Sequence, residues 1–232
     1  MSLFSDNLAA VQTRIRQACQ QAGRPEAGVC LLAVSKTWPA AAIREAFAAG
    51  QRAFGENYLQ EAQLKIDALA DLPIEWHFIG PLQSNKTRAV ATHFAWVHSV
   101  DSLKIARRLS EQRPADLPPL NLCLQVNISR EASKAGLPIE AVPELVDAIC
   151  TLPHIRLRGL MAIPEPAKDT SLRRQPFRQL RELLEELQKS RPELDTLSMG
   201  MSADLDEAIA EGSTLIRVGT ALFGSRPPKP QP

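Results

Sequence analysis

Short apolar runs alternate with longer amphipathic segments along the whole chain. The run at residues 29–34 is apolar on both faces, which is typical of a strand buried in a parallel sheet. The segments between such runs carry apolar residues three or four positions apart, which predicts helices. We therefore expect strand-then-helix units whose strands begin near residues 29, 52, 75, 95, 120, 155, 196 and 214.

Strict alternation of strands and helices predicts one parallel sheet with right-handed crossovers. Eight such units in 232 residues predict an α/β fold that closes into a single (β/α)8 TIM barrel. A doubly wound open sheet is the alternative. An extra N-terminal helix precedes the first strand, and we expect it to pack outside the barrel or to cover one end. We expect the barrel domain to span residues 1–226 and the proline-rich residues 227–232 to form a disordered tail.

Composition excludes several classes of function. The chain is 44% hydrophobic and 23% charged, which is ordinary for a soluble globular protein. Its net charge of +1 argues against nucleic-acid binding. No apolar run approaches the roughly 20 residues of a membrane span. The four cysteines form no CxxC pair, which indicates a reducing cytoplasm, and the four histidines lack the spacing of metal ligands.

A lysine follows the first predicted strand, at the end where barrels carry their functional groups. Lys36 comes after an apolar run, so we expect its amine to lie in the barrel mouth, where burial disfavours the charged form. A neutral amine can form a Schiff base with an aldehyde or ketone. A strand-end lysine whose amine reaches solvent is the alternative, and these residues alone leave both open.

Small residues follow the seventh and eighth predicted strands, at 198–202 and 216–220. Barrels often bind phosphate there through backbone N–H groups, and the hydroxyls of Ser202 and Thr220 are further donors. Ordinary tight turns are the alternative, because glycine and serine are common in turns for local reasons. Taken together with Lys36, the two loops indicate a ligand with a phosphate at one end and a carbonyl group at the other.

Five sequence motifs carry a family resemblance. In chain order they are Ala-Val-Ser-Lys at 33–36, Phe-Gly-Glu-Asn-Tyr at 54–58, Trp-His-Phe-Ile-Gly-Pro-Leu-Gln-Ser-Asn-Lys at 76–86, Leu-Ser-Met-Gly-Met-Ser at 197–202 and Arg-Val-Gly-Thr at 217–220. With them the chain resembles the YggS/PROSC family of pyridoxal-phosphate homeostasis proteins over nearly its whole length. The resemblance implies a fold-type III barrel like that of alanine racemase, with pyridoxal 5′-phosphate (PLP) as cofactor.

The resemblance also implies a set of cofactor-binding residues. They are Lys36, Asn57, Met199, Ser202, Arg217, Gly219 and Thr220. By this resemblance Lys36 forms the Schiff base with PLP, and Arg217 faces the pyridine nitrogen. Ser202, Gly219 and Thr220 hold the phosphate.

The other implied contacts lie around the ring. By resemblance, Asn57 lies near the ring and Met199 packs against it. His77 ends a predicted strand and is a weaker candidate, since a core histidine with satisfied hydrogen bonds fits equally well. Lys134 belongs to a loop at 133–136 that also resembles the family, and it either contacts the cofactor at the rim or is a solvated surface lysine.

The predicted function is to hold and deliver PLP without turnover. An arginine at the pyridine nitrogen stays charged and cannot accept a proton, so the ring is a weak electron sink. Alanine racemase has a similar arginine but also needs a second domain and a tyrosine base. Here the chain ends after the barrel, and its single tyrosine, Tyr58, lies in an early motif. We therefore expect no catalytic residues in a cytoplasmic monomer that supplies PLP-dependent apo-enzymes.

Two enzymatic functions are the alternatives. A small amino-acid racemase would use Lys36 as one base and would change the optical activity of amino acids. A Schiff-base aldolase acting on a sugar phosphate would also need a barrel, a lysine and a phosphate loop. A bound chromophore would separate the aldolase from the two PLP proteins.

Overall fold

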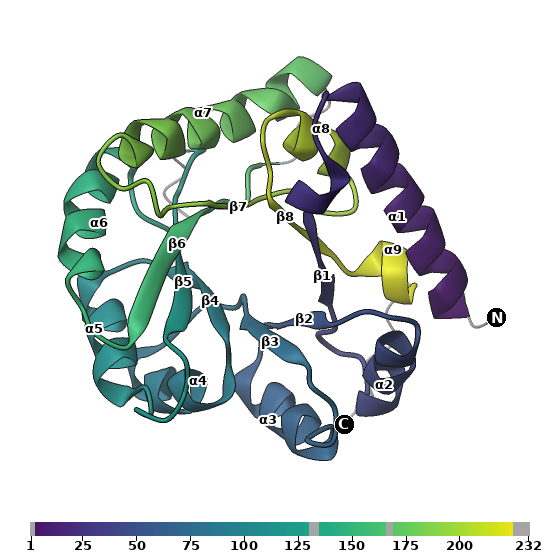
Figure 1. Cartoon of the computed structure of the whole chain (residues 1–232), viewed down its shortest axis with the longest axis horizontal. Coiled ribbons are helices and arrows are strands. Elements are labelled where there is room, and N and C mark those ends of the chain that lie inside the picture. Colours follow the sequence, from purple (N-terminus) through teal and green to yellow (C-terminus); the bar gives the residue numbers. More distant parts are fainter. Residues whose placement is uncertain (1–2, 130–134, 166–168, 225–232) are drawn as a thin grey trace.

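The strands close into a barrel in the order in which they occur along the chain (Figure 1). The computed structural model describes residues 3–129, 135–165 and 169–224. All neighbouring strands are parallel, and the first pairs with the last. The strands are β1 (Cys30–Val34), β2 (Ala53–Glu56), β3 (Glu75–Phe78), β4 (Trp96–Val100), β5 (Leu120–Gln125), β6 (Ile155–Met161), β7 (Thr196–Ser198) and β8 (Leu215–Val218).

Helices surround the barrel on its outside (Figure 1). They are α1 (Leu3–Gln21), α2 (Ala40–Ala48), α3 (Leu59–Ala68), α4 (Thr87–His93), α5 (Leu103–Gln112), α6 (Val142–Cys150), α7 (Thr170–Gln188), α8 (Leu205–Ala210) and α9 (Thr220–Phe223). The predicted (β/α)8 barrel with an additional N-terminal helix is therefore confirmed. The predicted disordered tail and Lys134 lie outside the described residues.

One strand is longer than its apolar pattern predicts. The apolar run that begins at residue 95 predicts a strand that ends at Val97, whereas β4 continues to Val100. His98 and Ser99 are thus strand residues, and both side chains are buried. An apolar pattern cannot reveal such positions, because buried polar side chains are stabilised by hydrogen bonds that only the fold creates.

The apolar core has two parts. The main core lies between the strands and the surrounding helices. Two small clusters lie apart from it, one of Leu32, Ala53 and Leu215 and one of Trp96, Cys123 and Met161. Successive side chains of a strand point to opposite faces, so these clusters lie on the inner faces of their strands. Arg217 and His77 are buried on the same inner faces, and both are polar. The barrel interior is therefore only partly apolar.

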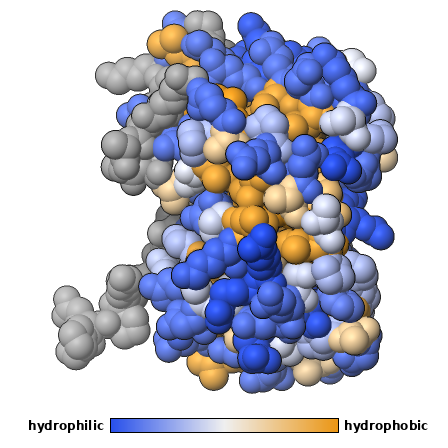
Figure 2. Space-filling view, turned by 90° about the vertical axis from the view of Figure 1, so that its left-hand side faces the viewer, coloured by the Kyte–Doolittle hydropathy of each residue, from blue (hydrophilic) through white to orange (hydrophobic). Residues whose placement is uncertain are grey.

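The outer surface of the barrel is mainly hydrophilic. Figure 2 shows the side of the barrel on which α6 lies, where hydrophilic residues cover most of the surface and apolar residues show between them. This is the surface expected of amphipathic helices packed on a sheet. Within the described part of the chain, no helix combines the length and the apolar character that crossing a membrane requires.

The N-terminal helix covers the helices that follow the last two strands. α1 lies beside α8 and α9 (Figure 1), and its buried side chains are Phe4, Leu8, Val11, Ile15, Ala18 and Cys19. The Phe4 ring packs on Phe223 with centroids 5.0 Å apart, and Asn7 Nδ2 donates a hydrogen bond of 2.9 Å to the Leu222 carbonyl. α1 therefore stabilises the part of the barrel that carries the two loops predicted to bind phosphate.

A buried ion cluster lies where β1 and β2 end. Glu56, the last residue of β2, is completely buried. Its Oε1 atom accepts hydrogen bonds from Ser35 Oγ at 2.6 Å and from Lys65 Nζ at 2.8 Å. Lys65 also donates to the Ser35 carbonyl at 2.9 Å and pairs with Glu61. Burial raises the pKa of Glu56, and the neighbouring Lys65 acts in the opposite direction.

The same cluster holds the backbone on both sides of Lys36. Ser35 precedes it and contacts Glu56 and Lys65 through its hydroxyl and carbonyl groups. The N–H of Thr37 donates to Glu61 Oε1 at 2.6 Å. Thr37 has a φ of 70°, a conformation uncommon for a residue with a Cβ, so this hydrogen bond stabilises a strained turn.

We predict that Lys65→Met destabilises the fold by about 3–5 kcal/mol, because it leaves the buried Glu56 carboxylate uncompensated. Without Lys65 the pKa of Glu56 rises further, so the folded state holds a proton that the unfolded state releases at neutral pH. The loss in free energy of unfolding should therefore be larger at about pH 8 than at about pH 5, and urea unfolding at the two pH values measures it. Lys104→Met, an exposed lysine of α5, is the control. An equal loss at both pH values would contradict this role of Glu56.

Candidate active-site cavity

A cavity of about 290 Å³ opens at the carboxyl ends of the strands. Polar residues from four places in the chain line it, together with Gly219: Lys36, Asn57, Ser202, Arg217 and Thr220. Apolar walls come from Val34, Trp38, Ile79 and Ile163. The Trp38 ring is stacked on Phe223 with centroids 5.6 Å apart, which fixes one wall.

The structure brings together all but one of the residues predicted to bind a cofactor. Met199 is the exception, since it is completely buried in the hydrophobic core and does not line the cavity. Gly200 follows it with a φ of 93°, and a Cβ there would lie 2.5 Å from Ala208 Cβ. The chain turns at Gly200, so that Met201 lines the cavity instead.

The two weaker candidates differ in position. His77 lies inside the barrel with a side chain 1% exposed, and it does not line the cavity. Its ring nitrogens contact His98 at 2.9 Å and Glu75 at 2.8 Å. The sequence fits a core histidine with satisfied hydrogen bonds as well as a cofactor contact, and the structure places His77 in the core with both ring nitrogens paired. Lys134 belongs to the residues that the structure does not describe.

Lys36 is half-buried at the exit of β1 and lines the cavity. Its neighbours Ser35 and Thr37 are both held by the buried ion cluster. The backbone that carries the amine is therefore fixed, and the side chain is directed to the same cavity as Arg217 and Ser202. This is the location that the sequence predicts for an amine sheltered in the barrel mouth.

Arg217 supplies a fixed positive charge to the cavity. It is buried, and its Nη1 atom donates to the carbonyl and the hydroxyl of Ser198 at 2.6 and 2.8 Å. Its Nη2 atom donates to the Ala162 carbonyl at 3.0 Å. Burial lowers the pKa of Arg217 to about 10, although Asp204 opposes the shift. The guanidinium therefore stays protonated at neutral pH and cannot act as a base.

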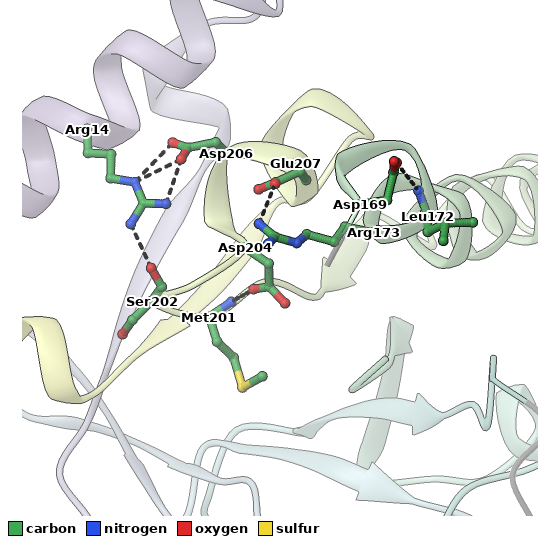
Figure 3. A network of polar contacts seen from close by, with 9 residues as sticks. All are labelled: Arg14, Asp169, Leu172, Arg173, Met201, Ser202, Asp204, Asp206 and Glu207. Atoms are coloured by element: carbon green, nitrogen blue, oxygen red, sulfur yellow. Dashed lines mark hydrogen bonds and ion pairs between the residues drawn. The ribbon is translucent and has the colours of Figure 1, made fainter. Parts of the chain in front are cut away.

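The loop that carries Ser202 is held from two directions (Figure 3). The N–H of Met201 donates to Asp204 Oδ1 at 2.6 Å. From α1, Arg14 Nη1 donates to the Ser202 carbonyl at 2.6 Å, and its Nη2 atom pairs with Asp206 at 2.5 Å. The sequence motifs did not reveal Arg14, because its contact with Ser202 spans 188 positions of the chain.

The cavity is suited to a ligand with both polar and aromatic parts. Its walls combine apolar side chains with hydroxyl, amine and guanidinium donors. Asn57 Oδ1 is buried, and within the described residues it accepts no hydrogen bond. Since buried polar atoms are normally paired, this oxygen indicates a partner that is not part of the protein. An anionic aromatic aldehyde such as PLP would find hydroxyl donors for its anionic group, an amine for its aldehyde and apolar walls for its ring.

Comparisons with known proteins identify the family of this chain. The family described as "Alanine racemase, N-terminal domain" matches residues 7–227. The chain is 64% identical to the pyridoxal phosphate homeostasis protein of Pseudomonas aeruginosa over 226 residues, covering 97% of each. It is 52% identical to the protein of that name from Escherichia coli K12 over 229 residues, covering 97% and 98%.

A solved structure shows the same architecture. PipY of Synechococcus elongatus PCC7942, with PLP bound, matches with a TM-score of 0.83 and 42% identity, covering 95% of this chain and 100% of that one. The expected resemblance is thus confirmed. The chain belongs to the pyridoxal phosphate homeostasis proteins, which share the alanine racemase N-terminal domain.

Proposed function

We propose that this protein binds PLP in the cavity at the carboxyl end of the barrel and acts in vitamin B6 homeostasis. It holds PLP as a Schiff base on Lys36 and buffers it or delivers it to PLP-dependent apo-enzymes. The observation that carries the proposal is the meeting of Lys36, Arg217 and the Ser202 loop in one cavity. The names of the relatives and the PLP bound to PipY support it.

Each part of the cavity has a task in holding the cofactor. PLP supplies an aldehyde that condenses with a primary amine. Lys36 Nζ forms the bond to the aldehyde carbon, and the carbonyl oxygen leaves as water. Ser202, Gly219 and Thr220 receive the phosphate, and the Arg14 contact keeps the Ser202 loop in place. The apolar walls exclude water from the new C=N bond, which slows its hydrolysis.

The residues around the ring favour retention over turnover. Arg217 carries a fixed charge and leaves the pyridine nitrogen unprotonated, so a carbanion gains little stabilisation. The chain has one tyrosine, Tyr58, which is 59% exposed. It borders a separate hollow with Gln83 and Lys86 and does not line the Lys36 cavity. These positions favour a carrier over a racemase that needs a tyrosine base beside the ring.

The proposal also includes the setting in which the carrier acts. We infer a cytoplasmic monomer that exchanges PLP with apo-enzymes. The four cysteines, which form no CxxC pair, support a reducing cytoplasm as this setting.

Lys36→Ala should abolish the absorption band that borohydride reduces when PLP is added to the protein. The reason is that the side chain which supplies the nitrogen of the C=N bond is absent. Lys104→Ala, on the exposed face of α5, is the matched control and should keep the band in full. A Lys36→Ala protein with the complete band would overturn the proposed attachment.

Arg217→Glu should shift the spectrum of the bound cofactor, because a carboxylate would favour protonation of the pyridine nitrogen. Arg217→Gln offers no acidic partner and should lack this shift. Absorbance spectra of both variants, recorded after circular dichroism shows that each is folded, make the comparison. A spectrum unchanged in Arg217→Glu would mean that Arg217 does not face the ring.

Arg14→Met should weaken PLP binding by roughly tenfold and leave pyridoxal binding nearly unchanged, since a charged hydrogen bond contributes about 1.5 kcal/mol. Pyridoxal lacks the phosphate, so its affinity does not depend on the Ser202 loop. Quenching of tryptophan fluorescence would measure both affinities. Arg16→Met, at an exposed position of the same helix, is the control. Equal losses for both ligands would indicate general destabilisation instead.

A further inference from the structure

A chain of polar side chains crosses the barrel interior from the cavity to the opposite end. Its links are Arg217 Nη1 to Ser198 Oγ at 2.8 Å, Ser198 Oγ to His98 Nδ1 at 2.7 Å, His98 Nε2 to His77 Nδ1 at 2.9 Å and His77 Nε2 to Glu75 Oε1 at 2.8 Å. The residues come from β8, β7, β4 and β3. Its inner members, Ser198, His98 and His77, do not line the cofactor cavity.

The inner links of this chain are shielded from water. Ser198 and His98 are completely buried, and His77 is 1% exposed. Glu75 is the first residue of β3, so it lies at the amino end of the barrel, and its side chain is 50% exposed. The chain therefore joins a solvated carboxylate to the guanidinium in the cavity through buried, uncharged links.

Arg217 determines the direction of every hydrogen bond in the chain. A guanidinium only donates, so Ser198 Oγ accepts from it and directs its own proton to His98 Nδ1. His98 must then carry its proton on Nε2, which donates to His77 Nδ1. His77 in turn carries its proton on Nε2 and donates to the Glu75 carboxylate.

The opposite direction of donation would leave a polar group unsatisfied at both ends of the chain. It would place a proton on His98 Nδ1, so the buried Ser198 hydroxyl would accept from two donors, and within the described residues it contacts no further acceptor. It would also direct the lone pair of His77 Nε2 at the Glu75 carboxylate. Both arrangements leave a polar group unsatisfied, so the two ends select the same pair of tautomers.

The surroundings keep both imidazoles neutral. Burial lowers the pKa of His77, although Glu75 opposes the shift. Burial lowers the pKa of His98 well below its usual range, and the positive charge of Arg217 acts in the same direction. The His77 ring is stacked on Trp96 with centroids 5.4 Å apart, and the Arg158 guanidinium lies 5.0 Å over that indole. The charges are thus confined to the two ends of the chain and to Arg158.

We propose that Ser198, His98 and His77 are positioning residues, which hold the Arg217 guanidinium in the cofactor cavity through a one-directional hydrogen-bond chain anchored on Glu75. Two of the three hydrogen bonds of the guanidinium end on Ser198. The rotation of the Ser198 hydroxyl therefore decides whether a lone pair of its Oγ faces the guanidinium. The effect on the cofactor rests on the proposed function, whereas the direction of the chain does not.

Nitrogen-15 NMR of the wild-type protein without PLP tests the direction. Both His77 and His98 should be neutral, with the proton on Nε2 and an unprotonated Nδ1. The variants His93→Gln and His154→Gln, at less buried positions, assign the remaining imidazole signals. A proton on Nδ1 of either residue, or a charged imidazolium at neutral pH, would overturn the proposal even if PLP binding is as proposed.

Substitutions within the chain test the effect on the cofactor. His98→Phe removes both ring nitrogens and should shift the absorption band of bound PLP and weaken its binding by roughly tenfold. His98→Asn keeps an acceptor near the Nδ1 position and should restore much of the wild-type spectrum. A folded His98→Phe protein with the wild-type spectrum would contradict the positioning role.

A substitution of Glu75, at the half-exposed end of the chain, leaves the buried hydrogen bonds in place. Glu75→Leu removes the terminal acceptor, so the His77 Nε2–H should lose its hydrogen bond and its proton and nitrogen signals should shift, whereas Glu75→Gln keeps an acceptor and should preserve them. Unchanged His77 Nε2–H signals in Glu75→Leu would show that Glu75 does not anchor the chain. If wild-type protein binds no PLP, the proposed function fails, but the NMR results still decide the direction of the chain.

Discussion

A buried charge must be compensated within hydrogen-bond distance, and this constraint organises the whole site. Lys65 lies between Glu56 and Glu61 beneath the exit of β1, and the same carboxylates hold the residues on both sides of Lys36. Arg217 is compensated differently, by neutral oxygens. Lys36 and Arg217 thus line the same cavity, and two separate polar networks hold them in place.

The rest of the fold completes the cavity from outside the barrel. α1 adds no strand, yet it covers α8 and α9 and contacts the Ser202 carbonyl through Arg14. The loops predicted to bind phosphate are therefore supported by a segment nearly two hundred positions away in sequence. Such support favours anion binding, because a loop that is ordered in advance loses less entropy when an anion binds.

Much of the fold could be predicted from the sequence, because buried parallel strands are short apolar runs between helices. Lys36 and the two loops could be located since barrels place functional groups at the carboxyl ends of strands. Met199 shows the limit of prediction from sequence, because the turn at Gly200 decides that Met201, and not Met199, lines the cavity. Polar residues inside the barrel, such as His98, give no apolar signal, and their partners come from distant strands.

The central claim is that the amine at the end of β1 forms the covalent link. Borohydride reduction of the PLP-loaded protein, followed by mass spectrometry of its peptides, tests it most directly. The account predicts one reduced phosphopyridoxyl group, located on Lys36 in the peptide that crosses from β1 to α2. Modification spread over surface lysines such as Lys104 and Lys189, with Lys36 unmodified, would contradict it.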